Sequence, residues 1–177
     1  LDRDTSGVMV LARTGEAVRH LQRQFAGHHA TKRYLALLHG ILPQERLTVR
    51  EPLARRERSG ERFMVVDPGG QQAETRFRQL ERYALPFPGA SLVEAEPVTG
   101  RTHQIRAHAA HLGAPLAGDT RYAGEDSLAA FRELGLRRLF LHAHSLAFEG
   151  LDGEPLLFSA PLPEELRTLL DRLQPAS

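Results

Sequence analysis

The chain has 177 residues, enough for one domain with a hydrophobic core. Hydrophobic residues make up 41% and charged residues 25%, and no apolar run approaches the roughly 20 residues that cross a bilayer. Cysteine is absent, which excludes disulfides, thiol nucleophiles and thiolate metal sites. The net charge of +1 excludes a uniformly basic coat, although local arginine clusters remain able to bind phosphate. We therefore expect a single cytoplasmic domain over residues 1–177.

The hydrophobic pattern predicts many short strands with a few helices between them. In chain order we expect a strand at 8–12, a helix at 16–26 capped by Thr14, and strands at 32–38, 47–53, 63–66, 73–80 and 91–97. Helices at 102–112 and 127–134, strands at 139–144, 146–148 and 156–158, and a helix at 163–173 follow. Because strands and helices do not alternate strictly, the expected fold class is α+β, with a mixed, mostly antiparallel β-sheet and flanking helices.

The first polar segment stands at the start of the chain, directly before the expected buried strand at 8–12. A carboxylate at the N-terminal end of such a strand is held by a rigid element yet lies outside the core. The alternative is that Asp4, Thr5 and Ser6 are ordinary turn formers. Ser6 does not lie in the GxSxG elbow of serine hydrolases.

The second polar segment covers residues 100–108 and opens the expected helix at 102–112. Thr102 and Arg106 are four residues apart and are expected to share a helix face. His103 and Gln104 fall in the first turn, where unpaired backbone N–H groups favour anions. An arginine there can hold a carboxylate or phosphate bidentately. The alternative is a surface helix whose charged side chains are solvated.

Histidines cluster in the same helix, so a metal site has to be weighed. His103, His108 and His111 lie close in sequence, but no carboxylate accompanies them and their spacing matches neither zinc fingers nor the HExxH motif. His142 and His144 alternate on an expected strand and are interpreted as half-buried polar residues. We expect no metal.

Taken together and in order, these segments resemble pseudouridine synthases of the RluA type, which modify uridines in ribosomal and transfer RNA. The family pattern HRLDxxTSG is similar to residues 1–7, and a strand containing a tyrosine is similar to 32–36. A third family motif is similar to residues 97–108, followed by Gly113-Ala114-Pro115, Gly118-Asp119 and Tyr122. The tail also matches, at 141–143, 153–155 and 160–163, so the resemblance spans nearly the whole chain.

The resemblance implies an isomerase in which Asp2, not Asp4, is the nucleophile. It implies that Arg106 pairs with Asp2 and that Tyr34 contacts the target base. The expected substrate-binding residues are Arg3, Thr5, Arg101, Thr102, His103 and Gln104. Breaking a glycosidic bond builds positive charge on the sugar, which a carboxylate stabilises or captures. The reaction needs no cofactor, and the expected partner is rRNA or tRNA, with no membrane and no obligate protein partner.

The sequence departs from the family pattern at its start. The His and Arg that precede Leu-Asp in the family are absent, as are the strands expected upstream. We therefore expect a catalytic domain cut just before its nucleophile. A second hypothesis is an RNA-binding fragment without turnover, and a third is a histidine-rich metal hydrolase.

Overall fold

The computed structural model describes residues 1–176. Its strands are β1 Ser6–Gly7, β2 Thr31–His39, β3 Arg46–Arg50, β4 Leu53–Arg58, β5 Glu61–Val66, β6 Glu74–Tyr83, β7 Ala90–Pro97, β8 Leu141–Glu149 and β9 Pro155–Ser159. Its helices are α1 Gly15–Ala26, α2 Gln104–His111, α3 Glu125–Glu133 and α4 Glu164–Arg172.

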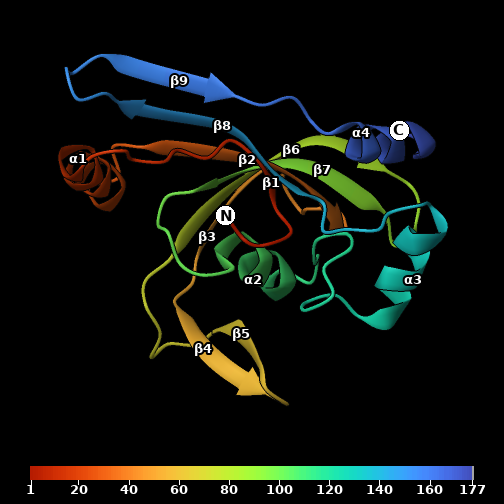
Figure 1. The fold of residues 1–177 in the computed structure, drawn as a ribbon. Coiled ribbons are helices and arrows are strands. Elements are labelled where there is room, and N and C mark those ends of the chain that lie inside the picture. The colour runs from red at the N-terminus through yellow and green to blue at the C-terminus, as the bar shows by residue number, and fades with distance from the viewer. Residues whose placement is uncertain (177) are drawn as a thin grey trace.

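A seven-stranded sheet runs through the molecule in the order β1-β8-β2-β7-β6-β3, with β9 paired to β8 (Figure 1). The β1–β8 pair is parallel, and the other pairs of this sheet are antiparallel. Strands β4 and β5 form a separate ribbon that projects below the sheet in Figure 1. The predicted α+β class with a mixed, mostly antiparallel sheet is confirmed.

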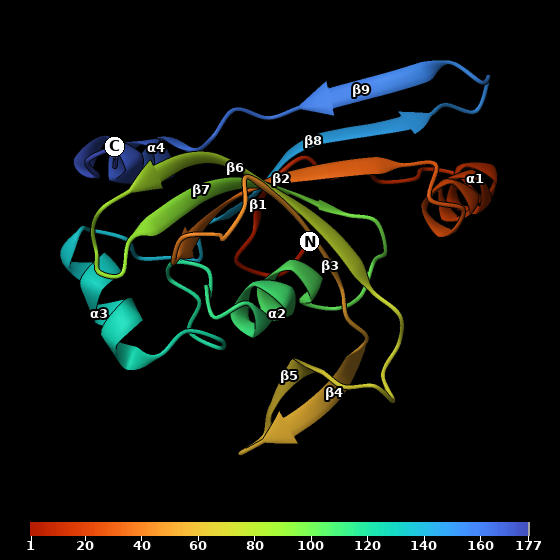
Figure 2. The same ribbon diagram turned by 180° about the vertical axis from the view of Figure 1, so that it is seen from behind.

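The central strand β2 supplies apolar side chains to both faces of the sheet. Ala36 and Leu38 belong to a core cluster shared with α2, whereas Leu37 belongs to a cluster shared with α3 and α4. Successive residues of a strand point to opposite faces, so β2 separates the two clusters. Figures 1 and 2 show α2 below the sheet and α4 above it.

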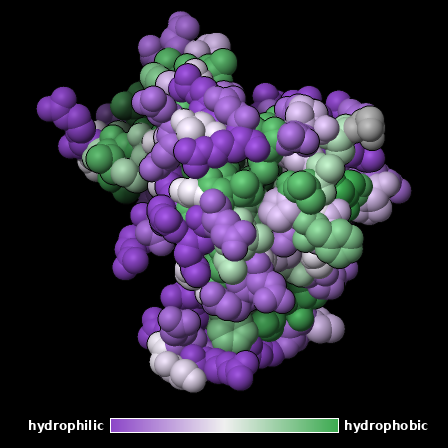
Figure 3. Space-filling view, turned by 90° about the vertical axis from the view of Figure 1, so that its right-hand side faces the viewer, coloured by the Kyte–Doolittle hydropathy of each residue, from purple (hydrophilic) through white to green (hydrophobic). Residues whose placement is uncertain are grey.

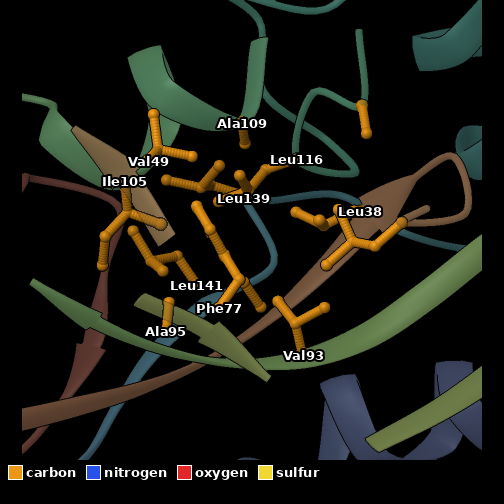
Figure 4. Packing of buried hydrophobic residues seen from close by; sticks show 13 residues of the cluster. Leu38, Val49, Phe77, Val93, Ala95, Ile105, Ala109, Leu116, Leu139 and Leu141 are labelled. Carbon is orange, nitrogen blue, oxygen red and sulfur yellow. The ribbon is translucent and has the colours of Figure 1, made fainter. Parts of the chain in front are cut away.

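The core on the α2 side is built around Phe77, which is 2% exposed and packs among branched side chains from the sheet and α2 (Figure 4). The other side of α2 packs against the β4–β5 ribbon, where Leu53 and Met64 belong to one hydrophobic cluster with Ala107. Helix α2 is therefore covered on two sides, and every residue from Gln104 to Ala109 is buried. Its polar side chains must find hydrogen-bond partners inside the protein.

The strand expected at residues 8–12 is wrong. Met9 and Leu11 are 61% and 76% exposed, and only the N–H of Val8 bonds to β8, at the carbonyl oxygen of Ala143. The apolar composition of this segment suits a strand. Within residues 1–176, however, the strand pairing with β8 ends at Gly7, and no strand pairs with residues 8–12.

Other elements shift at their ends. The expected strand at 47–53 stops at Arg50, and β4, which was not expected as a strand of its own, begins at Leu53. The two strands expected at 139–148 are the single strand β8. The helix expected from Thr102 begins at Gln104, so Thr102 and Arg106 do not share a helix face. The predicted cap of α1 is confirmed, because Thr14 Oγ1 accepts a hydrogen bond from the N–H of Ala17.

The surface is mixed in character. Figure 3 shows apolar patches scattered among polar side chains on the side that carries α3 and α4. Within residues 1–176, each helix is too short or too polar to span a lipid bilayer.

Candidate active site

A pocket of about 320 Å³ lies where the N-terminal loop, β2 and the start of α2 meet. Four parts of the chain that are far apart in the sequence form its wall. Its lining residues are Leu1, Asp2, Thr5, Lys32, Tyr34, Pro97, Thr99, Gly100, Arg101, Thr102, His103, Gln104, Ile105, Arg106 and Leu141.

The loop that carries Asp2 is fastened to β8. The N–H of Thr5 donates to the carbonyl oxygen of Asp2 at 3.0 Å, which closes a turn. Gly7 then pairs with Ala143 at a φ of +121°, and a Cβ at this position would overlap the carbonyl oxygen of Ala143. Glycine is therefore required where this loop enters the sheet.

A hydrogen-bonded chain of side chains also fixes this loop. Arg138 donates to Ser6 Oγ at 2.9 Å and to the carbonyl oxygen of Asp4 at 3.3 Å. Ser6 Oγ lies 2.9 Å from His142 Nδ1, and His142 Nε2 lies 3.0 Å from the carbonyl oxygen of Ala160. Since Nε2 must donate to that carbonyl, Nδ1 accepts from the serine. His142 is 2% exposed, so it is buried and not half-buried as expected.

Arg106 is held between two aspartates. Its Nε and Nη2 donate to the two carboxylate oxygens of Asp119, each at 2.8 Å, and its Nη1 donates to Asp2 Oδ2 at 3.2 Å. The side chains of Arg106, Asp119 and Asp2 are 11%, 0% and 25% exposed. Burial alone would lower the pKa of Arg106, but the hydrogen bonds and charge of Asp119 and Asp2 raise it overall. Asp119 thus fixes a permanent cation that faces Asp2.

Tyr122 covers the outer side of this arginine. Its ring centroid lies 5.2 Å from the guanidinium carbon of Arg106, and its hydroxyl accepts from the N–H of Met64 at 2.8 Å. The same hydroxyl lies 2.9 Å from His103 Nδ1. Burial, followed by the charge of Arg106, lowers the pKa of His103, although Asp2 opposes this. His103 is therefore neutral at physiological pH.

Tyr34 lies across the pocket on β2. The pairing of β2 with β8 shifts register between Arg33 and Tyr34, and such a bulge re-aims the side chains around it. Burial, followed by the negative charge of Asp2, raises the pKa of Tyr34. Its phenol is therefore protonated at neutral pH and able to donate a hydrogen bond.

Gln104 is buried below the pocket and has all its hydrogen-bonding capacity in use. Its Oε1 accepts from Thr99 Oγ1 at 2.6 Å and from the N–H of Arg101 at 3.1 Å. Its Nε2 donates to the carbonyl oxygen of Glu74 at 2.8 Å and to Thr75 Oγ1 at 3.0 Å. Gln104 therefore holds residues 99–101, which line the pocket, in position.

The family described as RNA pseudouridylate synthase matches residues 1–111 of this chain. The chain belongs to this family. Two curated relatives named ribosomal large subunit pseudouridine synthase C, from Haemophilus ducreyi and Escherichia coli K12, are each 42% identical to it. The alignments cover 98% and 99% of this chain but 54% and 55% of the relatives, so the chain spans about half their length.

Solved structures of the same family agree with the fold. Human RNA pseudouridylate synthase domain containing 1 superposes with a TM-score of 0.83 at 31% identity, covering 100% of this chain and 72% of that one. Human RNA pseudouridylate synthase domain containing 4 gives 0.77 at 26% identity, covering 98% and 74%.

In this pseudouridylate synthase fold, the three residues expected to be catalytic, Asp2, Tyr34 and Arg106, line one pocket. The expected substrate-binding residues Thr5, Arg101, Thr102, His103 and Gln104 line it as well. Arg3 does not: its side chain is 93% exposed and pairs with Asp4 at 3.4 Å. Within residues 1–176, no group of three or more His, Cys, Asp or Glu residues is placed to hold a metal ion.

The residues that support the pocket were not assigned roles from the sequence. Asp119 and Tyr122 belong to the third family motif, and this was the sequence signal that could have pointed to a role for them. Their contacts with Arg106 are seen only in the folded structure. Lys32 also lines the pocket, and burial lowers its pKa. The pairing of β1 with β8 brings together Ser6, Arg138 and His142. The spacing of these residues in the sequence does not predict that they meet.

The buried His108 predicts a loss of stability in acid. Its Nδ1 lies 2.8 Å from Thr75 Oγ1 and its Nε2 donates to the carbonyl oxygen of Glu51 at 2.9 Å. Burial lowers its pKa below the ordinary 6.5. Between the two pKa values, His108 is protonated in the unfolded chain but neutral in the native chain. The stability that neutral His108 contributes above pH 6.5 is therefore lost as the pH falls toward the lower native pKa.

Accordingly, His108→Gln should flatten the fall in melting temperature between about pH 7.5 and about pH 5. The exposed His29, replaced by Gln, is the matched control and should leave the slope unchanged. Thermal unfolding followed by circular dichroism measures both. An equal slope in the parent and His108→Gln would contradict the prediction.

Proposed function

We propose that residues 1–177 act as one catalytic domain that isomerises uridine to pseudouridine in RNA. The observation that carries this proposal is the Asp2 carboxylate, 3.2 Å from the Arg106 guanidinium at the wall of a pocket that Tyr34 also lines. An ionised carboxylate is able to attack or stabilise an anomeric carbon.

In the proposed reaction the Asp2 carboxylate forms a bond to C1′ of the target nucleotide while the N1–C1′ bond breaks and its electron pair leaves with the uracil. The detached uracil turns within the pocket. C5 then forms the new bond to C1′ while the Asp2–C1′ bond breaks and its electron pair returns to the carboxylate. C5 gives up its proton and N1 gains one, so the product is an isomer and no redox partner is consumed. Tyr34 offers a flat ring and a phenol to the base during this turn. The base has to leave its stack to reach the pocket.

We propose that the substrate is a uridine of large-subunit ribosomal RNA and that the enzyme acts in the cytoplasm. The names of the curated relatives support this choice, since each is a ribosomal large subunit pseudouridine synthase. A protein that binds RNA also needs cations near the reaction site. Lys32 and Arg101 line the pocket, and Arg121 lies next to Asp119.

A second candidate function is RNA binding without turnover. It is favoured by one observation, that the chain spans about half the length of its curated relatives. The part of the relatives that lies outside the match would then supply groups that catalysis requires.

The two candidates separate in one assay. Large-subunit ribosomal RNA carrying tritium at uridine C5 is incubated with the chain, because formation of the C5–C1′ bond releases that tritium to water. Binding of the same RNA is measured by filter retention. Tritium release supports the isomerase, whereas retention of RNA without release supports the binding fragment. Transfer RNA labelled in the same way tests the choice of substrate.

Tyr34 provides a graded prediction. Tyr34→Phe keeps the stacking face and loses only the phenol, whereas Tyr34→Ala loses both and opens the pocket. We expect Phe to lower turnover by about 10-fold and Ala by about 100-fold or more, in line with 1–3 kcal/mol for a stacked base. Initial rates of tritium release measure this order. A larger loss for Phe than for Ala would contradict a stacking role.

A further inference from the structure

The hydrogen bonds of Tyr122 determine which nitrogen of His103 carries the proton. The hydroxyl oxygen of Tyr122 already accepts from the N–H of Met64 at 2.8 Å. Burial raises the pKa of Tyr122, so its phenol keeps its proton and needs an acceptor for it. His103 Nδ1, at 2.9 Å, is the acceptor available among residues 1–176. Neutral His103 therefore carries its proton on Nε2.

The backbone of His103 is also unusual. It precedes α2 in the left-handed conformation, with φ 51° and ψ 25°, which a non-glycine residue adopts at a cost of about 1 kcal/mol or more. Two contacts with Tyr122 hold the ring in place, the hydrogen bond and an edge-to-face packing with centroids 5.6 Å apart. Such strain concentrates at functional sites and persists where surrounding contacts fix it.

The remaining ring nitrogen of His103 is not engaged by any side chain or backbone group that the structure describes. His103 lines the pocket beside Asp2 and Arg106, and within residues 1–176 no hydrogen bond is made by its Nε2. Arg106 already uses three of its five N–H groups on Asp119 and Asp2. His103 is thus a lining residue of the pocket whose ring is fixed and neutral and whose Nε2–H makes no hydrogen bond within residues 1–176.

We propose that His103 Nε2–H donates to O4 of the target uracil and so selects uridine over cytidine, with Tyr122 as the positioning residue that fixes the tautomer. This inference rests on the proposed isomerase function. Cytosine carries an amino group where uracil has O4, and two donors facing each other repel. A site built around a hydrogen bond rejects an analogue that cannot complete it, because the donor then loses its partner.

The first test needs no RNA. Nitrogen-15 spectra of the histidine side chains, with His103 assigned by its loss in His103→Asn, report which ring nitrogen is protonated. We expect protonated Nε2 and bare Nδ1 in the parent chain. Tyr122→Phe removes the hydroxyl and should raise the share of the Nδ1–H form. A parent in which Nδ1 carries the proton would overturn the inference.

The second test compares RNA binding in an Asp2→Asn background, which prevents conversion of the substrate. Two RNAs are used that differ only in uridine or cytidine at the target position. His103→Asn suits the left-handed backbone but is too short to reach the base. It should reduce the preference for uridine by about 10-fold, the worth of one hydrogen bond. His111→Gln, at the exposed end of α2, is the control and should keep the preference.

If His103→Asn preferred the uridine RNA over the cytidine RNA as strongly as the parent does, the proposal would be overturned, even if both RNAs bound more weakly. The proposed donor meets O4 in one RNA and an amino group in the other, so its loss has to change that preference. Failure of the parent to bind either RNA would instead contradict the proposed function. The tautomer measurement would then still decide whether His103 carries the donor.

Discussion

Replacing Asp119 with Asn is expected to lower the free energy of unfolding by about 3 kcal/mol and to reduce turnover by at least about 100-fold. Asp119 is fully buried and binds Arg106 through both carboxylate oxygens. It also accepts from the N–H groups of Arg121 and Tyr122. The amide keeps one oxygen but points an NH₂ group at the guanidinium, which leaves a buried cation poorly paired.

Urea denaturation and tritium release measure these two effects. Asp67, a partly exposed aspartate paired with Arg56, is the matched control. Since exposed pairs contribute about 0–1 kcal/mol, Asp67→Asn should change stability little and leave turnover intact. Equal losses in the two variants would show that Asp119 has no special role.

The second large effect separates stability from chemistry. In the double variant Arg106→Met/Asp119→Leu the buried pair is replaced by apolar side chains of similar size. Such replacements are neutral or stabilising in other proteins, so the free energy of unfolding should recover part of the loss seen in Asp119→Asn. The N–H groups of Arg121 and Tyr122 still lose their acceptor, which costs about 1 kcal/mol or more. Turnover should stay abolished, because Asp2 has lost its cation.

Affinity for RNA should fall much less than turnover in this double variant, since Arg106 faces Asp2 and not the open surface. Filter retention and tritium release give the two values from the same samples. Restored stability together with restored turnover would show that the Arg106–Asp2 contact is not needed for the reaction.

The sequence predicted the elements whose signal is local. The helix capped by Thr14 and the hairpin turn at Asp152-Gly153 depend on short-range chemistry, and both are present. The segment at 8–12 failed because an apolar run becomes a strand only when a neighbour pairs with it. The merger of two expected strands into β8 has the same origin, since its ladder with β2 continues through residues that interrupt the apolar pattern.

The candidate site divides in a similar way. Asp2, Tyr34 and Arg106 were identified through motifs that resemble a family, and they do meet in one pocket. The groups that hold them were not identified. Because α2 is buried between the sheet and the β4–β5 ribbon, Arg106 needs a buried partner, and that partner is Asp119. Burial of that kind is a property of the whole fold and leaves little trace in local sequence.

The reaction assigned to this pocket is tested most directly by tritium release in a pair of variants from the same loop. Asp2 faces Arg106, whereas Asp4 is exposed and pairs with Arg3. Each is changed to Asn in the same chain and assayed on the same C5-tritiated ribosomal RNA. We expect release by the parent and by Asp4→Asn, and none above background by Asp2→Asn. Release by Asp2→Asn at the parent's rate would contradict this expectation.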